Sequence, residues 1–329
     1  MIEPHLAPRR VALLGPQSVT RTVPDVVRAF GLDGCNVATI TAGWEERERD
    51  DAELDRDLGG CSRNLALFPR AEKVFERDKE LRRLMHQRYD RMNEQAAYYR
   101  AMLAPLLASL RQIELGLAAG TPHLRAERDN CVRLLQELDA HRLRVVDELD
   151  AEVFERLRPF ERTEIARHRE ELRRILDGVG GVLIAGGHVG ILVNRLRLFG
   201  VMELIRDLPV IAWSGGAMVM TERVVLFHDF PPESRGTHGG GGDPEVHVRG
   251  IGLARGVVAL PHPKKRLDLA DSARVGAFAA RFSSAGAVCL GLDAGARLVG
   301  RSDQPVGEWE ESTGVVQLTE AGAVPWRAN

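Results

Sequence analysis

Cysteine is scarce in this sequence, which contains only four in 329 residues. The four lie far apart and none belongs to a CxxC or CxH pair: they are Cys35, Cys61, Cys131 and Cys289. This spacing excludes a disulfide scaffold and a zinc site built from cysteines, and it is typical of a protein of a reducing compartment. We therefore expect a cytoplasmic protein.

Long apolar runs and a strong net charge are also lacking. No apolar stretch approaches the ~18 residues that span a bilayer, and the N-terminal MIEPHLAPRR lacks the apolar core of a secretory signal. The 45 basic residues nearly balance the 47 acidic ones, whereas a nucleic-acid-binding protein carries a strong basic excess. The sequence therefore predicts neither a membrane nor a nucleic acid as a partner.

Sequence motifs for cofactors are missing as well. There is neither the GxxxxGK[ST] of a nucleotide-binding loop nor a GxGxxG after the first apolar run. No HxH or HExxH spacing indicates a metal site. We expect no metal ion and no organic cofactor.

What is present is the composition of a folded protein, with 44% hydrophobic and 28% charged residues. The first zone, residues 1–69, alternates short apolar runs with turn residues. It contains three such runs and one amphipathic helix, at residues 11–15, 37–41, 64–68 and 23–30. Apolar runs of this length predict strands that are buried on both faces of a parallel sheet.

The second zone, residues 70–177, is poor in Gly and Pro and rich in Arg, Glu and Leu. Apolar residues recur there every three or four positions, the period of a helix with one buried stripe: they include Leu81, Leu84, Met85, Tyr89 and Met92. We predict long helices at 70–118 and 123–157, with Pro105 as a candidate kink, and a third helix at 160–177. Such a helical insertion is a candidate surface for a homodimer or a partner protein, while its charges belong to solvated faces.

The third zone, residues 178–329, returns to strands and glycines. We predict strands at 181–187, 208–213, 256–261, 287–292 and 296–300, and helices at 189–199, 216–222 and 268–282. Strands that alternate with helices predict a three-layer α/β sandwich with a mostly parallel sheet, flavodoxin-like or amidotransferase-like. Residues 1–69 and 178–329 would form this core around the insertion. Residues 231–247, rich in glycine and without apolar period, predict a mobile loop and a candidate lid.

The candidate catalytic motif is a serine between a strand and a helix. Trp213-Ser214-Gly215-Gly216 follows the predicted strand at 208–213 and precedes a helix, as in a nucleophile elbow. The N–H of Gly215 would stabilise an oxyanion, and Gly187 of the Gly186-Gly187 pair would supply a second donor. The alternatives are a serine that serves packing or phosphate binding and a plain helix-entry turn at the glycines.

A serine nucleophile needs a base. His262 follows the predicted strand at 256–261, so we place it at the same carboxyl edge of the sheet, with His188 lining the pocket and His228 as a weaker candidate. Glu45, Glu46 and Arg47 also end a strand at this edge. We interpret these three as a helix N-terminus rather than as pocket residues.

These residues resemble a known family over about residues 178–300. The matching segments are the strand that leads into Gly186-Gly187, the Trp-Ser-x-Gly-Ala elbow at 213–217, the strand–His with a basic run at 262–266, and Gly291-Leu-Asp293. The chain is similar to the serine peptidases of the dipeptidase E and cyanophycinase group, which have the class I glutamine-amidotransferase-like fold. The resemblance implies that Ser214 is the nucleophile, His262 the base, Gly187 and Gly215 the oxyanion donors, and Asp229 the acid of the triad. It also suggests substrate-binding roles for His188, Trp213 and Arg266.

The sequence departs from the family pattern at several positions. Leu260-Pro261 replaces an Asp-Gln before the histidine, Pro263 follows it, and Ala294 stands where an acidic residue is usual, which leaves Asp293 as a substitute acid. We predict a serine hydrolase that cleaves a small peptide or isopeptide, with an acidic residue at the cleaved bond, through an acyl-enzyme. The alternatives are a catalytically silent binding protein and an acyltransferase or amidotransferase-like protein on the same fold.

Overall fold

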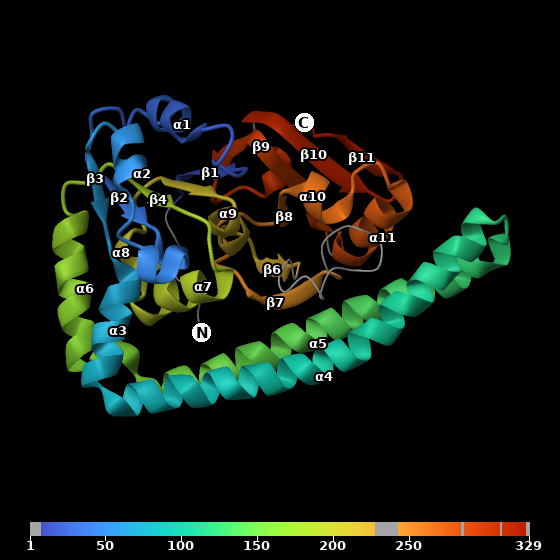
Figure 1. Cartoon of the computed structure of the whole chain (residues 1–329), viewed down its shortest axis with the longest axis horizontal. Helices are drawn as coiled ribbons and strands as arrows, with labels where there is room; N and C mark the ends of the chain where they lie inside the picture. The colour runs from blue at the N-terminus through green and yellow to red at the C-terminus, as the bar shows by residue number, and fades with distance from the viewer. Residues whose placement is uncertain (1–7, 228–242, 284–285, 310, 327–329) are drawn as a thin grey trace.

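The computed structural model describes residues 8–227, 243–283, 286–309 and 311–326, and Figure 1 gives the arrangement of their helices and strands. The strands are β1 (Arg10–Leu14), β2 (Val37–Ile40), β3 (Ser62–Asn64), β4 (Gly181–Ile184), β5 (Val210–Trp213), β6 (Arg223–Leu226), β7 (Glu245–Arg249), β8 (Val257–Pro261), β9 (Val288–Arg301), β10 (Glu311–Thr319) and β11 (Gly322–Pro325). The α-helices are α1 (Val23–Ala29), α2 (Ala52–Asp57), α3 (Leu67–Arg77), α4 (Lys79–Ala118), α5 (Arg125–Leu157), α6 (Thr163–Leu176), α7 (Val189–Leu198), α8 (Val201–Leu204), α9 (Gly215–Met220), α10 (Pro263–Leu267) and α11 (Ser272–Phe282). Short 3-10 turns include η1 (Ala42–Arg47) and η6 (Val306–Glu308).

One mixed sheet forms the centre of the molecule. Its strand order is β11-β10-β9-β1-β5-β4-β2-β3, with β8 paired in parallel to the first part of β9. The five strands from β1 to β3 in this order are all parallel, while β9, β10 and β11 pair antiparallel. β1, β2, β4 and β5 are apolar and nearly all buried, as expected for strands covered on both faces.

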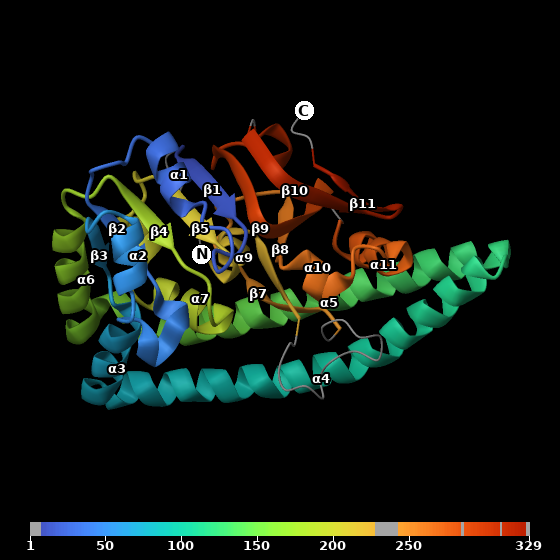
Figure 2. The ribbon, with the colours of Figure 1, turned by 45° about the horizontal axis from the view of Figure 1, so that its top comes forward.

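Helices cover both faces of this sheet, which gives the three-layer α/β sandwich that the sequence predicts (Figure 2). On one face, α1 packs on the alternate side chains Ala12, Leu14 and Leu183. On the other face, α3 and α6 to α9 pack on Val11, Ile184 and their neighbours. The apolar stripes of these helices and the period-two alternation of the strands therefore fix the layers.

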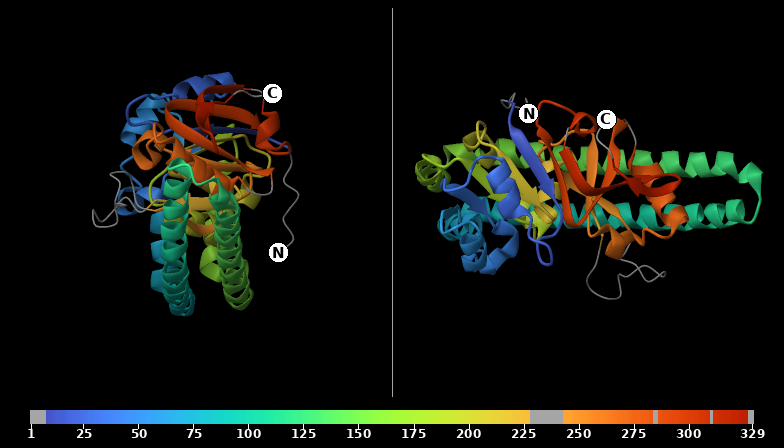
Figure 3. Two further views of the ribbon diagram at one scale, coloured as in Figure 1. Left: turned by 90° about the vertical axis from the view of Figure 1, so that its right-hand side faces the viewer. Right: turned by 90° about the horizontal axis from the view of Figure 1, so that it is seen from above.

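The chain between β3 and β4 forms a long helical arm, which we define as α4 and α5. α4 has 40 residues and α5 has 33, and the two helices run side by side beneath the α/β layers and extend past α11 (Figures 1 and 3). Leu103, Leu107 and Leu110 of α4 face Leu135 of α5 in one apolar cluster. α4 continues through Pro105 without a break.

The predicted single helix at 70–118 is wrong in one respect. Asp78 separates α3 from α4, with φ −105° and ψ 88°, and its side chain accepts a hydrogen bond from the N–H of Leu81 at 2.9 Å. The Asp78 carboxylate also binds Arg162 at 2.7 Å. A side-chain cap of this kind starts a new helix, so α4 leaves α3 in a new direction.

Two buried ion-pair networks fasten the arm to the rest of the molecule. Arg281 of α11, only 2% exposed, binds both carboxylate oxygens of Asp139 in α5 at 2.7 Å. The Tyr99 hydroxyl of α4 donates to Asp139 at 2.6 Å and accepts from the N–H of Val246 in β7 at 3.1 Å. The second network, Arg88–Asp150–Arg197, joins α4 and α5 to α7.

Among the described helices, α4 is long and apolar enough to cross a membrane by length and composition alone. Its most apolar 18-residue window has a mean hydropathy of 1.2, and 17% of that window is buried. One such helix is weak evidence, because part of its apolar surface packs on α5. Tyr89, Tyr98 and Met102 remain 57–61% exposed on α4, and the homodimer or partner role of the arm stays a prediction.

Two other sequence predictions need correction. The predicted strand at 64–68 is β3 followed by the start of α3, because Ala66 turns the chain with φ 49° and its N–H bonds to the Asn64 side chain at 2.9 Å. The end of the predicted loop at 231–247 belongs to β7, which pairs with β6. Residues 228–242 of that loop lie outside the described residues.

Candidate functional site

Several strands end at one edge of the sheet, which we call the carboxyl edge. The register pairs Ile184 of β4 with Ala212 of β5, and Leu14 of β1 with Trp213. Parallel strands in this register bring the residues that follow each strand to a common edge, where ligands bind in open α/β sheets. Ser214, the Gly186-Gly187 pair and the η1 turn all begin here.

Ser214 has a backbone conformation that L-amino acids rarely adopt. Its φ is 51° and its ψ is −123°. The surrounding main chain holds this turn, since the N–H of Ser214 donates to the Leu14 carbonyl at 3.0 Å and its carbonyl accepts from Met218 at 3.2 Å. All six residues of α9 are buried, whereas Ser214 is partly exposed. This turn, which we call the elbow, thus holds a serine with a strained backbone between a buried strand and a buried helix.

The Gly186-Gly187 pair that follows β4 lies against this elbow. A Cβ atom added to Gly186 would lie 2.9 Å from the Ser214 Cβ, 3.1 Å from its Oγ and 2.8 Å from the Gly215 nitrogen. Gly187 has φ +109°, and a Cβ there would lie 2.3 Å from the Gly43 carbonyl oxygen. Gly186 is required by its close approach to the elbow, and Gly187 by its positive φ and its close approach to η1. Only glycine meets these requirements without strain.

Two main-chain N–H groups are available beside Ser214. Within the described part of the chain, neither Gly187 nor Gly215 donates its N–H in a hydrogen bond. Gly215 directly follows Ser214, and a Cβ on Gly215 would lie 3.1 Å from the Gly187 carbonyl oxygen. The structure therefore brings together Ser214, Gly187 and Gly215, the three residues that the sequence assigns to nucleophile and oxyanion donors.

His262 follows β8 and lies near the same edge. Contrary to the sequence prediction, it does not end a strand of the parallel set, because β8 is parallel to β9 and β9 runs antiparallel to β1. The His262 N–H donates to the Leu292 carbonyl at 3.3 Å, and its backbone is left-handed with φ 55° and ψ 47°. Leu292 is followed by Asp293, whose carbonyl oxygen lies against Gly15. A Cβ atom added to Gly15 would lie 1.8 Å from that oxygen. Gly15 follows Leu14, whose carbonyl accepts the hydrogen bond from the Ser214 N–H. Main-chain contacts therefore connect the His262 turn to the elbow. The imidazole is partly exposed.

The structure describes only one of the two candidate acids of the triad. Asp229 lies outside the described residues. Asp293 is partly buried, with 25% of its side chain exposed, and binds the Lys264 ammonium at 3.1 Å. Asp293 is thus already engaged by a cation on the helix that follows His262.

The three predicted substrate-binding residues have different surroundings. His188 is exposed and caps α7, with its Nδ1 accepting a hydrogen bond from the N–H of Ile191 at 3.2 Å. Trp213 is 7% exposed and packs in the apolar cluster under α1, so little of its ring can meet a substrate. Arg266 is partly buried, and its guanidinium donates to the Pro261 carbonyl at 3.3 Å.

The sequence places the η1 segment at this edge but does not predict the contacts of Gly43 with the glycine pair. Gly43 accepts a hydrogen bond from the N–H of His188 at 2.7 Å, and a Cβ on Gly43 would lie 2.6 Å from the Gly186 carbonyl oxygen. Glu45 has φ 59° and ψ −124°, close to the values of Ser214. The Ala-Gly directly after a buried strand was the available signal, since small residues there permit such contact.

Glu48, just after η1, is a buried carboxyl group. It is 1% exposed, and burial raises its pKa from 4.5 to about 7 although the N–H groups of Leu67 and Phe68 donate to it at 3.1 and 2.5 Å. Between pH 4.5 and about 7, the Glu48 carboxyl group loses its proton in the unfolded chain but keeps it in the folded one. The Glu48 contribution to stability is therefore full below pH 4.5 and is lost as the pH rises to about 7.

We expect the Glu48→Gln variant to lose this pH dependence. Urea unfolding at several pH values measures the free energy of unfolding of both proteins. Between pH 4.5 and 8 the native chain should lose about 2–3 kcal/mol relative to the variant, because only the native chain carries the Glu48 carboxyl group. Glu46→Gln, exposed on the same segment, is the control and should follow the native curve. A constant difference between Glu48→Gln and the native chain would contradict the prediction.

Comparisons with known proteins leave the family open. No family model matches the chain, and no curated protein matches it. Solved structures similar to it include the crystal structure of a peptidase from an acI-B1 Actinobacterium, with 13% sequence identity, a TM-score of 0.45, and coverage of 95% of this chain and 91% of that one. A similarity at this level carries no argument about activity or about individual residues.

Proposed function

We propose that this protein is a serine hydrolase of the dipeptidase E and cyanophycinase type, which cleaves a small peptide or isopeptide through an acyl-enzyme. The observation that carries the proposal is the strained backbone of Ser214 at the carboxyl edge, with φ 51° and ψ −123°. Strain of this kind persists only where the surrounding structure enforces it, and it is concentrated at functional sites. A serine that only filled space in this turn would not require such a backbone, because a less strained turn could hold it.

The proposed chemistry uses residues of the carboxyl edge. Ser214 Oγ attacks the amide carbonyl carbon while His262 accepts the hydroxyl proton. The N–H groups of Gly187 and Gly215 donate to the oxyanion that forms. His262 then gives the proton to the leaving amine, the C–N bond breaks, and water hydrolyses the ester by the same route.

The remaining roles extend this proposal. Asp229 would orient the imidazole and stabilise its charged form, and Asp293 is the substitute if Asp229 does not reach it. Arg266 would bind the carboxylate of an acidic substrate residue by charge-assisted hydrogen bonds. Lys264 is a weaker candidate for that role because it already binds Asp293 at 3.1 Å.

The test is to incubate the protein with a fluorophosphonate probe and with p-nitrophenyl acetate, then locate any adduct by peptide mass spectrometry. An adduct on the Ser214 peptide, together with a burst of p-nitrophenol, is the expected result. Intact, unmodified Ser214 with both reagents would overturn the hydrolase and favour the silent binding protein. Transfer of the acyl group to an added amine faster than to water would favour the acyltransferase.

We expect Gly186→Ala to lower kcat/KM for ester or peptide hydrolysis by roughly 100-fold. The added Cβ would lie 2.8 Å from the Gly215 nitrogen, so the donor must move, and displacements of this size at a reacting centre cost about that factor. Gly307→Ala is the matched control, because a Cβ there has no atom within 4 Å and its φ is not positive. Equal activity in both variants would argue against the proposed oxyanion donors.

A further inference from the structure

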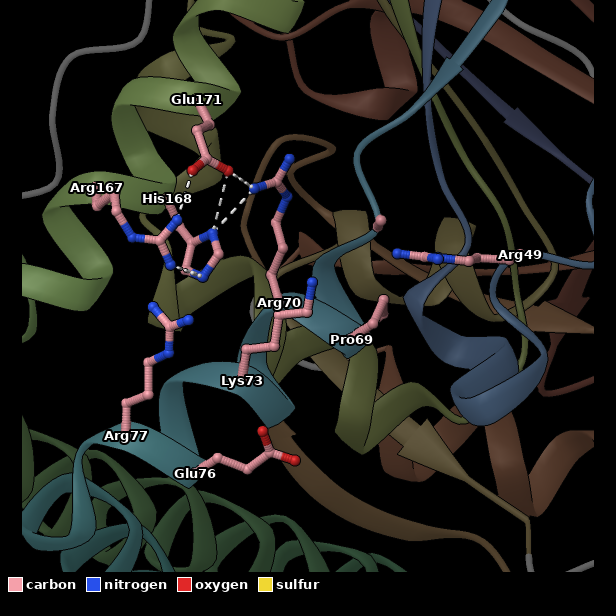
Figure 4. A pocket seen from close by; sticks show the side chains of 10 residues that line it. Arg49, Pro69, Arg70, Lys73, Glu76, Arg77, Arg167, His168 and Glu171 are labelled. Atoms are coloured by element: carbon pink, nitrogen blue, oxygen red, sulfur yellow. Dashed lines mark hydrogen bonds and ion pairs between the residues drawn. The ribbon is translucent and has the colours of Figure 1, made fainter.

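A cavity lies apart from the carboxyl-edge site, between α3, α6 and the segment after η1 (Figure 4). Its volume is about 450 Å³, within the range of small-molecule sites. It is lined by Arg49, Ala66, Pro69, Arg70, Lys73, Glu76, Arg77, Arg167, His168 and Glu171. It lies beside β3, three strands from β5, which corresponds to about 14 Å across the sheet.

The lining of this cavity is strongly cationic. Five of its side chains are Arg or Lys and only two are carboxylates. Glu164, at the start of α6, adds one more carboxylate, which binds Arg77 at 3.0 Å and Arg167 at 2.9 Å. Positive charge remains in excess even when Glu164 is included. Ala66 and Pro69 are the apolar lining residues, so the wall offers little surface to an apolar ligand.

Two of the cations have no carboxylate partner within the described residues. Neither Arg49 nor Lys73 forms an ion pair there, although Glu72 and Glu76 are close to Lys73 in sequence. Figure 4 shows the Arg49 guanidinium and the Lys73 ammonium directed toward the cavity. Cations that are held without a counter-charge around a concave surface attract anions from solution.

The cations on α3 are spread along one face of the helix. Arg70, Lys73 and Arg77 are three and then four residues apart, the spacing that keeps side chains on one side. At about 1.5 Å per residue, they cover roughly 10 Å. One phosphate group cannot reach both ends of such a row, whereas two linked groups can.

A buried histidine lies between two of the arginines. His168 is 3% exposed, its Nδ1 lies 2.9 Å from Arg70 Nη1, and its Nε2 lies 3.1 Å from Arg167 Nη2. Glu171 Oε2 lies 3.4 Å from Nδ1 and also binds Arg70. A proton on Nδ1 would point to Glu171, and Nε2 would then accept from Arg167. Guanidinium N–H groups only donate, so a neutral ring accepts from just one of the two arginines, and Arg70 is held through Glu171 instead.

The charge state of His168 agrees with that arrangement. Burial lowers the pKa of the imidazole, and the nearby Arg167 and Arg70 guanidinium groups lower it further, against the opposing effect of Glu171. The ring is therefore neutral at neutral pH and does not add to the repulsion between the guanidinium groups. The excess charge remains on the arginines and the lysine that line the cavity.

We propose that this cavity binds a small anion that carries at least two phosphate groups. Arginine forks recognise phosphate oxygens in pairs, and the row on α3 together with Arg49 on the opposite wall provides separate contacts for two groups. The proposal is independent of the hydrolase activity, because none of these residues belongs to the carboxyl-edge site.

The test is calorimetric titration with inorganic pyrophosphate, phosphate and sulfate at constant ionic strength. Saturable binding of pyrophosphate, at least tenfold tighter than that of phosphate or sulfate, is expected. Equal affinities for pyrophosphate and phosphate would overturn the requirement for two groups. Heat that does not saturate, or that disappears at 150 mM salt, would overturn the site and leave only diffuse surface attraction.

Variants locate the binding to the cavity. Arg49→Gln and Lys73→Gln should each weaken pyrophosphate binding by about tenfold, the effect of losing one charged hydrogen bond. Arg144→Gln is the matched control, since Arg144 is an exposed arginine on the arm without an ion pair among the described residues. If all three variants weakened pyrophosphate binding equally, binding would depend on net charge alone, and the proposal would be overturned. Thermal unfolding without ligand confirms that each variant is folded.

Discussion

Replacing Ser214 with alanine should abolish covalent labelling by fluorophosphonate and lower the hydrolysis rate by roughly 10³-fold or more. Loss of the attacking hydroxyl removes the acyl-enzyme route, and in serine hydrolases such a loss reduces kcat by up to about 10⁶-fold. The measurements are the initial rate with p-nitrophenyl acetate and the mass of the labelled protein. Residual labelling in the Ser214→Ala variant would show that another residue reacts.

Two further variants make this result specific. Ser272→Ala removes an exposed serine at the start of α11 and should leave the rate unchanged. His262→Ala should lower the rate by an amount similar to Ser214→Ala, because nucleophile and base act as a unit. A His262 variant with native activity would separate the histidine from the serine and contradict the proposed proton transfer.

Replacing Asp139 with alanine should destabilise the protein by about 3–5 kcal/mol. The variant leaves the Arg281 guanidinium, 2% exposed, without the carboxylate that accepts two of its hydrogen bonds at 2.7 Å. Breaking a buried ion pair by removing one partner costs this much, because the other charge stays buried and uncompensated. Urea unfolding followed by circular dichroism measures the change.

Asp147 provides the matched control on the same helix. It binds Arg249 of β7, but 40% of its side chain and 49% of that of Arg249 are exposed. Exposed pairs are screened by water, so Asp147→Ala should cost less than about 1 kcal/mol. Equal costs for the two variants would show that the Asp139 network does not fasten the arm to the α/β layers.

The parallel part of the sheet could be predicted from the sequence for a physical reason. Strands such as β4 and β5 are apolar at every position because helices cover both faces, and this pattern is visible locally. The same holds for the elbow, where a serine between a strand and two glycines indicates the turn at Ser214. The structure brings the predicted Gly187 to this turn, because β4 and β5 are neighbours.

Other parts of the fold depend on contacts that no local pattern contains. β9 runs from Val288 to Arg301 through Asp293-Ala294-Gly295, which has the composition of a turn, because β10 pairs with both of its halves across a register shift. Likewise, His168 is surrounded by charged residues in a segment whose charged faces are predicted to be solvated, yet α3 covers it. Packing between distant elements decides both cases.

The arm also determines how the molecule moves through a solvent. At about 1.5 Å per residue, the 40 residues of α4 measure roughly 60 Å, whereas a compact chain of this length has a radius of gyration near 20 Å, which corresponds to a sphere about 50 Å across. The frictional coefficient of a monomer must then exceed that of a sphere of 36.3 kDa. A monomer would elute early from a gel-filtration column and could be mistaken for a dimer, so its mass is better taken from light scattering or sedimentation equilibrium.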